Sequence, residues 1–125
     1  MKKSIVITVD IMGFTKLSHS ESPEKTANYI VSYYKLVQSL VARYNWRFVK
    51  GIGDCVLISA DLNVPMSRLN EFYETLSKEY DVNVFFRKCE YCEQLVAIGD
   101  YSCLDIFGKD INKLFSGDSS TVKIG

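Results

Sequence analysis

The sequence predicts an α+β fold, a ferredoxin-like βαββαβ sheet with helices on one face and a C-terminal strand and helix added. Short runs rich in β-branched residues alternate with longer runs of helical periodicity, and two of the strand-like runs flank a glycine-rich turn. With 125 residues, 47% of them hydrophobic, the chain is long enough to bury one ordinary core. We therefore expect a single domain over residues 1–125.

The first strand and the first helix have clear signals. Residues 4–9 are almost all apolar and rich in β-branched side chains, which is typical of a strand covered on both faces. Ser22, Pro23 and Glu24 supply a cap, a proline at the first helical position and an early acid. Apolar residues at helical spacing then extend this helix to about Tyr44.

Two apolar stripes run along this helix. The stripe assigned to the core contains Ala27, Ile30, Val31, Tyr34, Val37, Val41 and Tyr44. The second stripe contains Tyr29, Tyr33, Leu36 and Leu40. One sheet does not normally cover so much apolar surface, so the second stripe is either part of a broad buried face or a surface for self-association.

The rest of the chain supplies a hairpin, a second helix and further strands. Residues 46–49 and 55–60 are β-rich runs, and the glycines of residues 50–54 form the turn between them. Pro65 opens a second helix, whose apolar stripe contains Leu69, Phe72, Tyr73, Leu76 and Tyr80. We expect neighbouring strands over 82–86 and 94–98, a short helix from about Lys109, and a last strand over 121–124.

The composition excludes several classes of function. Fifteen acidic residues balance fifteen basic ones, so no overall field draws the protein to nucleic acid or to a membrane surface. No segment approaches the roughly 18 apolar residues of a membrane span, and we expect a cytoplasmic protein. The four cysteines are expected to be free thiols; Cys89 and Cys92 have metal-ligand spacing, but no second pair of this kind exists to complete a zinc site.

Asp10 and Asp54 are the candidate metal ligands. Asp10 ends the first predicted strand, Asp54 lies at the hairpin turn, and a ferredoxin-like sheet places these two elements side by side. Two carboxylates that share a site repel each other unless a proton or a cation lies between them, and oxygen ligands suit Mg²⁺ or Mn²⁺. Met12 and Gly13 follow Asp10, where backbone N–H groups are able to face a phosphate. Taken singly, each acid is more often a turn or cap residue than a ligand.

Three segments resemble, in the right order, signature segments of the class III nucleotidyl cyclases, the adenylate and guanylate cyclase catalytic domain. They are VDIMGFTKLS from residue 9, KGIGDC from residue 50 and LDIFGKDIN from residue 104. Their separations also fit the plan of that domain, so the resemblance spans residues 6–112. It implies a nucleotidyl cyclase that converts a nucleoside triphosphate, ATP first, to a 3′,5′-cyclic nucleotide and pyrophosphate.

The resemblance implies roles for the first two segments. Asp10 and Asp54 would hold two Mg²⁺ or Mn²⁺ ions, with the Ile11 carbonyl as a further ligand. Backbone amides of the loop from Ile11 to Thr15 would hold the β- and γ-phosphates, with Gly13, Phe14 and Thr15 as the substrate-binding residues of this loop.

The resemblance also implies how the nucleoside is held. Lys50 and Asp105 would contact the base: the lysine donates to adenine N1 and the carboxylate accepts from the N6 amine, although cytosine and guanine remain open. Asn112 would orient the ribose. Because sites of this family lie between two protomers, a homodimer is expected, and the second stripe of the first helix is a candidate contact surface.

Two features depart from the family. Ser116 stands where the family usually has an arginine that stabilises charge on the α-phosphate, and a serine offers one neutral hydrogen bond in place of a charged, bidentate one. The chain ends at Gly125, before the part that usually supplies a lysine for the triphosphate, for which Lys123 is a poor substitute. The alternatives are therefore an active cyclase, a weak or inactive relative that binds a nucleotide as a sensor or sequestering protein, and an interaction module without nucleotide.

Overall fold

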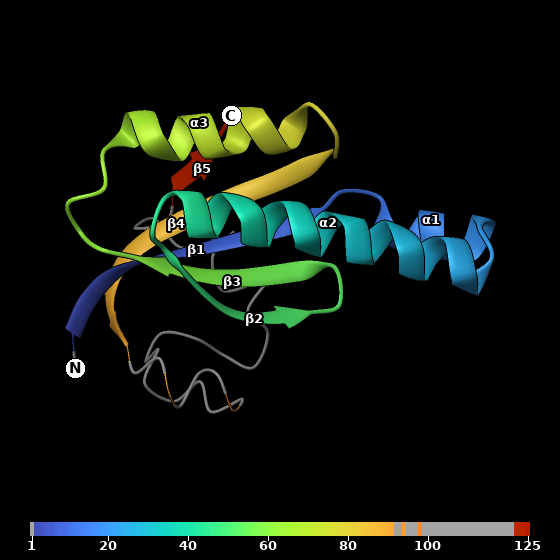
Figure 1. The fold of residues 1–125 in the computed structure, drawn as a ribbon, viewed down its shortest axis with the longest axis horizontal. Helices are drawn as coiled ribbons and strands as arrows, with labels where there is room; N and C mark the ends of the chain where they lie inside the picture. Colours follow the sequence, from blue (N-terminus) through green and yellow to red (C-terminus); the bar gives the residue numbers. More distant parts are fainter. Residues whose placement is uncertain (1, 92–93, 95–97, 99–121) are drawn as a thin grey trace.

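A computed structural model describes residues 2–91, 94, 98 and 122–125. Five antiparallel strands form one sheet in the order β2-β3-β1-β4-β5. The strands are β1 (Lys2–Ile11), β2 (Arg47–Ile52), β3 (Cys55–Ala60), β4 (Val82–Tyr91) and β5 (Val122–Ile124). The helices are α1 (Phe14–Ser20), α2 (Pro23–Arg43) and α3 (Met66–Ser77). The long helices α2 and α3 cover one face of the sheet (Figure 1), which confirms the ferredoxin-like arrangement with a strand added beside β4.

The central strand β1 is longer than the sequence predicts. It pairs with β3 on one side and with β4 on the other, and both ladders include Asp10, opposite Cys55 and Asn83 respectively. The prediction that Asp10 ends this strand is therefore wrong. Because β4 pairs with β1 as far as Ile11, the ladder continues past the acid, and Asp10 lies inside a strand held on both edges.

Helix α2 begins as predicted and buries residues of both predicted stripes, Val37 and Val41 from the first and Tyr33 and Leu40 from the second. The Ser22 hydroxyl caps it by accepting a hydrogen bond from the Lys25 N–H at 3.2 Å. Tyr33 and Leu40, from the stripe that was the candidate contact surface, are fully buried in the core of the same chain, whereas Val31 is 49% exposed. The second stripe is thus part of a broad buried face, because the i, i+4, i+7 row that begins at Tyr33 points at the sheet.

Helix α1 has no counterpart among the predicted elements. Gly13 precedes it with φ +70°, in the left-handed region that favours glycine, and this turns the chain sharply out of β1. The helix has seven residues, no side-chain cap and no acid in its first turn. Without those signals a short helix is not distinguishable from a loop in the sequence.

The hairpin and the last strand are found where the sequence places them, but one predicted strand is not. Gln94 is helical and Ile98 lies in a turn, which contradicts a strand over 94–98 at both positions. Residues 84–86 of β4 pair with β5 instead, on the edge away from β1. The helix predicted from Lys109 lies outside the described residues.

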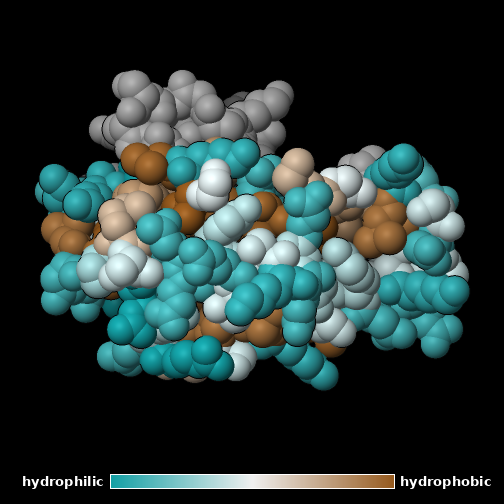
Figure 2. Space-filling view, turned by 90° about the horizontal axis from the view of Figure 1, so that it is seen from above, coloured by the Kyte–Doolittle hydropathy of each residue, from teal (hydrophilic) through white to brown (hydrophobic). Residues whose placement is uncertain are grey.

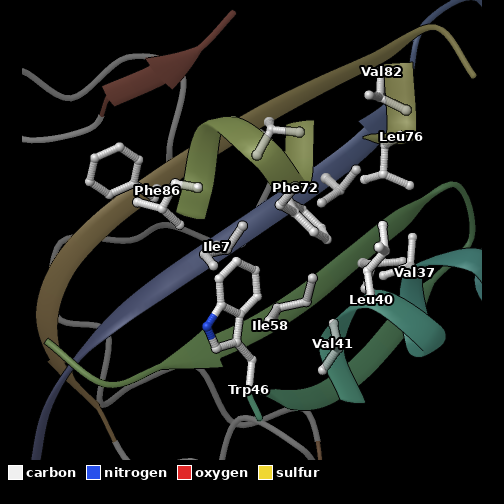
Figure 3. Close-up of a cluster of buried hydrophobic side chains, with 14 of the residues drawn as sticks. Ile7, Val37, Leu40, Val41, Trp46, Ile58, Phe72, Leu76, Val82 and Phe86 are labelled. Carbon is white, nitrogen blue, oxygen red and sulfur yellow. The ribbon is translucent and has the colours of Figure 1, made fainter. Parts of the chain in front are cut away.

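The core lies between the sheet and the two long helices. Ile7 and Ile58 of the strands face Val37 and Leu40 of α2 (Figure 3), and the core also includes Val41, Trp46, Phe72, Leu76, Val82 and Phe86. Each fully buried aliphatic or aromatic side chain of this kind contributes about 1.5–3 kcal/mol. Hydrophilic residues cover most of the face seen in Figure 2. Among the described residues, no helix combines the length and the apolar character needed to cross a membrane.

Candidate metal centre

Asp10 lies on the face of the sheet opposite the long helices. Its neighbours Val9 and Ile11 belong to the core between sheet and helices, and alternation along the strand directs Asp10 to the other face. The carboxylate is about half-buried, and its Oδ1 atom is inaccessible to solvent and accepts no hydrogen bond. A buried carboxylate oxygen without a partner costs free energy unless a cation or a proton occupies the position beside it.

Asp54 is brought to the same end of the sheet by the hairpin. Ile52 pairs with Cys55, which leaves Gly53 and Asp54 as a two-residue turn. Gly53 has φ +60°, which an L side chain adopts only with strain, so glycine suits this position. Since Cys55 is the cross-strand partner of Asp10, the turn residue before it lies next to that pair.

The two carboxylates are close enough to repel each other. Burial is the main cause that raises the pKa of Asp10 above its usual value, and the charge of Asp54 is the second. A hydrogen bond from its own backbone N–H and the charge of Lys123 act in the opposite direction. Lys123 is an exposed residue of β5, opposite Phe85, so it reaches Asp10 across β4 on the same face of the sheet.

Two tyrosines of α2 donate hydrogen bonds to the backbone beside the two aspartates, and the sequence predicts neither contact. The Tyr33 hydroxyl donates to the carbonyl oxygen of Val9 at 3.2 Å, and the Tyr34 hydroxyl donates to the carbonyl oxygen of Gly53. In the sequence, both residues appear as members of apolar stripes. The helical pattern identifies a buried ring, but it carries no information about the acceptor of the hydroxyl.

One backbone amide of the segment predicted to bind phosphates donates its hydrogen bond elsewhere in the chain. The Met12 N–H donates to the Asp81 carbonyl at 2.8 Å, so this amide does not face a phosphate as the sequence suggested. Gly13 is the N-cap of α1, and Phe14 and Thr15 begin the helix, where N–H groups have no acceptor within the helix. Of the segment predicted to bind phosphates, the amides of residues 13–15 are therefore the ones that stay candidates.

The remaining predicted site residues are only partly placed. Ile11 is the last residue of β1, opposite Val82. Lys50 lies in β2 opposite Leu57, which in turn pairs with Thr8, so Lys50 is on the face that carries Asp10. Asp105, Asn112 and Ser116 lie outside the described residues.

The donor atoms at this site suit a hard divalent cation. Within the part of the chain that the structure describes, no group of three or more histidine, cysteine or acidic side chains is gathered in a metal-binding arrangement. The two aspartates offer carboxylate oxygens, the ligand type that suits Mg²⁺ or Mn²⁺, and these ions usually complete their coordination with water and substrate phosphates. The unpartnered Oδ1 of Asp10 is the position that such an ion would satisfy.

The family of the chain follows from sequence comparison. The family model described as the adenylate and guanylate cyclase catalytic domain matches residues 2–100, which is most of the chain. The chain belongs to this family. The matched region of this chain includes both aspartates and every strand of the described sheet except β5. No curated protein matches the chain.

Solved cyclase structures share the fold of this cyclase family domain. A bacterial light-regulated adenylyl cyclase is 15% identical, with a TM-score of 0.63 over 70% of this chain and 53% of that one. The adenylyl cyclase CyaB from P. aeruginosa is 18% identical, with a TM-score of 0.57 over 70% and 56% of the two chains. The guanylate cyclase domain of RhGC from Catenaria anguillulae, solved in complex with GTP, is 19% identical, with a TM-score of 0.53 over 70% and 55%. The chain thus spans little more than half of each of these structures.

Proposed function

We propose that this cyclase family domain binds a nucleoside triphosphate together with Mg²⁺ or Mn²⁺ and, as a homodimer, converts it to a 3′,5′-cyclic nucleotide and pyrophosphate. The observation that carries the proposal is the buried Oδ1 of Asp10, which lacks a hydrogen-bond partner and lies beside a second carboxylate. A carboxylate oxygen that is buried without a partner costs stability, and a bound cation would offset that cost.

Separate sets of residues bind the cations and the phosphates of the nucleotide. Asp10 and Asp54, with the carbonyl of Ile11, hold two cations, and the N–H groups of residues 13–15 bind the β- and γ-phosphates. When bound, the divalent ions lower the pKa of the ribose 3′-hydroxyl and neutralise charge on the departing pyrophosphate. The half-buried position of Asp10 strengthens its interaction with a cation, because the surrounding dielectric is lower than in water.

The nucleoside is held by the second protomer of the dimer. Lys50 and Asp105 pair with the base and Asn112 orients the ribose, so that each site combines the aspartates of one chain with the base-binding residues of the other. A lysine donor and a carboxylate acceptor match N1 and the N6 amine of adenine. ATP is therefore the first substrate to test, and GTP is the second.

A second candidate function is nucleotide binding with little or no turnover. Ser116 favours it, because a neutral hydroxyl stabilises the charge that develops on the α-phosphate less than a guanidinium does. In that case the domain acts as a sensor or a sequestering protein for a nucleotide. Both functions use the same aspartates.

Incubation with each of the four nucleoside triphosphates and Mn²⁺, followed by mass detection of cyclic products, separates the two. A cyclic product that disappears in Asp10→Ala supports the cyclase. Nucleotide binding that Asp10→Ala abolishes, without product from any of the four, supports the binding protein. If the wild-type chain neither binds nor converts any nucleotide, both functions are refuted.

A further inference from the structure

We infer that Tyr33 and Tyr34 are positioning residues, which together hold the two candidate metal-binding aspartates in place from helix α2. The inference rests on the proposed cation site. It depends on one coincidence in the structure: each tyrosine donates a hydrogen bond to the carbonyl of the residue immediately before one of the two aspartates.

The Tyr33 hydroxyl is bonded to the peptide that leads into Asp10. It donates to the Val9 carbonyl oxygen at 3.2 Å from a fully buried position. The Val9 carbonyl, the Asp10 nitrogen and the Asp10 Cα lie in one peptide plane. A hydrogen bond that fixes this carbonyl therefore also fixes the plane from which the Asp10 side chain projects.

The Tyr34 hydroxyl does the same for Asp54. It donates to the Gly53 carbonyl oxygen, in the peptide plane that leads into Asp54. The ring reaches this turn because Gly51 has no side chain: a Cβ at that position would lie only 2.5 Å from the Tyr34 hydroxyl oxygen. Because this peptide plane adjoins the Cα of Asp54, the bond has a direct influence on where the Asp54 carboxylate lies.

Packing against other aromatic rings restrains the two tyrosine side chains. The Tyr33 ring packs edge-on against Tyr80, with centroids 5.6 Å apart, and the Tyr34 ring packs against Phe48 at 6.2 Å. Burial raises the pKa of both tyrosines, so both hydroxyls stay protonated and able to donate. Neighbouring residues on a helix point about 100° apart, which lets one turn of α2 reach both β1 and the hairpin.

Hydrogen bonds from α2 help to keep the carboxylates of Asp10 and Asp54 close together despite their repulsion. Asp10 and Asp54 repel each other in the absence of a cation, and a hairpin turn is free to relieve that repulsion by moving away. A contact from α2 to each backbone opposes this movement before any cation arrives. The site is thereby preorganised, which lowers the cost of cation binding.

The test is Mn²⁺ binding to the full chain without nucleotide, measured by calorimetry for the variants Tyr33→Phe and Tyr34→Phe. Each variant removes a hydroxyl and keeps the ring, and we expect each to weaken Mn²⁺ affinity by about fivefold, the effect of one net hydrogen bond. Tyr29→Phe is the matched control, because Tyr29 lies on the same helix and packs against Tyr80 at 5.3 Å, away from both aspartates. Asp10→Asn is the control for the cation site itself.

The outcomes separate this inference from the proposed function. If Asp10→Asn abolishes Mn²⁺ binding while both tyrosine variants bind Mn²⁺ as the wild type does, the cation site stands and the positioning role is refuted. A fall in melting temperature with unchanged Mn²⁺ affinity also refutes it, since that result indicates a purely structural role. If the wild type binds no Mn²⁺ without nucleotide, no preorganised cation site exists and this inference is refuted, whereas the proposed function is decided by the nucleotide experiment.

Amide hydrogen exchange without metal provides a second, independent measurement. We expect Tyr34→Phe to accelerate exchange at residues 53–55 and to leave the centre of β1 unchanged, because only the turn loses a contact. Exchange at the turn equal to that of the wild type would show that Tyr34 does not hold it, whatever the metal measurement gives.

Discussion

Replacement of Asp10 by asparagine is expected to stabilise the metal-free protein while it removes the response to metal. The substitution keeps the size of the side chain and eliminates its charge. Burial and the neighbouring Asp54 both raise the pKa of Asp10, which means that the folded state disfavours the ionised carboxylate more than the unfolded state does. At neutral pH the wild-type protein therefore folds with a charge that costs stability.

The size of the effect follows from the environment of the carboxylate. Asparagine keeps a polar atom at this position, so the gain comes only from removing a charge that is half-buried and repelled by Asp54; for a partly solvated charge this amounts to about 1 kcal/mol. For a domain of this size, about 1 kcal/mol corresponds to a rise in melting temperature of roughly 4 °C. A cation at 100 times its dissociation constant stabilises the wild type by about 2.7 kcal/mol, or roughly 10 °C, and leaves Asp10→Asn unchanged.

Thermal unfolding followed by circular dichroism, with and without Mn²⁺, measures both effects. Without metal the variant melts at the higher temperature, and with metal the order is reversed. The stability advantage of Asp10→Asn over the wild type is complete at pH values above the raised pKa of Asp10 in the folded protein. It disappears below about pH 4, the ordinary pKa of an aspartate, because the wild-type carboxylate is then neutral in both the folded and the unfolded state. A metal-free variant that is less stable than the wild type at pH 7 would refute this account of the site.

Three further substitutions test the packing around the site. Gly51→Ala places a methyl group against the Tyr34 ring and is expected to cost about 1–3 kcal/mol in urea unfolding; an unchanged midpoint would show that the ring does not lie over the hairpin. Ser22→Ala removes the cap of α2 and is expected to lower the free energy of unfolding by about 1 kcal/mol, whereas Ser22→Asp restores it. Phe72→Ala leaves a cavity beneath Trp46 and is expected to cost about 3–5 kcal/mol by urea unfolding, with a loss below about 2 kcal/mol contradicting its central place in the core.

The parts of the fold that the sequence predicts are those with strong local signals. The cap and proline at Ser22 and Pro23 locate the start of α2, and the glycines of residues 50–54 locate the hairpin, because the backbone there has special conformational needs. Helix α1 has no side-chain cap, no proline at its start and no acid in its first turn, so the sequence does not distinguish it from a loop. The length of β1 was underestimated for a different reason: its final pairs depend on β4, which is distant in sequence.

The same distinction applies to the candidate site: local sequence predicts its acids but not the contacts that depend on the packing of distant elements. Asp10 and Asp54 stand out in the sequence as acids beside apolar runs, and the sheet topology is sufficient to bring them together. The hydrogen bonds of Tyr33 and Tyr34 depend on how α2 is rotated over the sheet, and the two adjacent stripes along the helix do not determine that rotation. The approach of Lys123 to Asp10 depends on the pairing of β5 with β4, for which the local sequence contains no signal.

The position of Asp10 inside a doubly paired strand has a consequence for folding as well. A slip of β1 by one residue against its neighbours would turn this carboxylate into the apolar layer beneath α2 and α3 and move Val9 and Ile11 out of it. Such a misaligned sheet is heavily penalised, since it buries a charge among hydrophobic side chains. The same aspartate whose charge is unfavourable in the correctly folded domain thus discriminates against its misregistered alternatives, and so helps the chain to select one strand alignment.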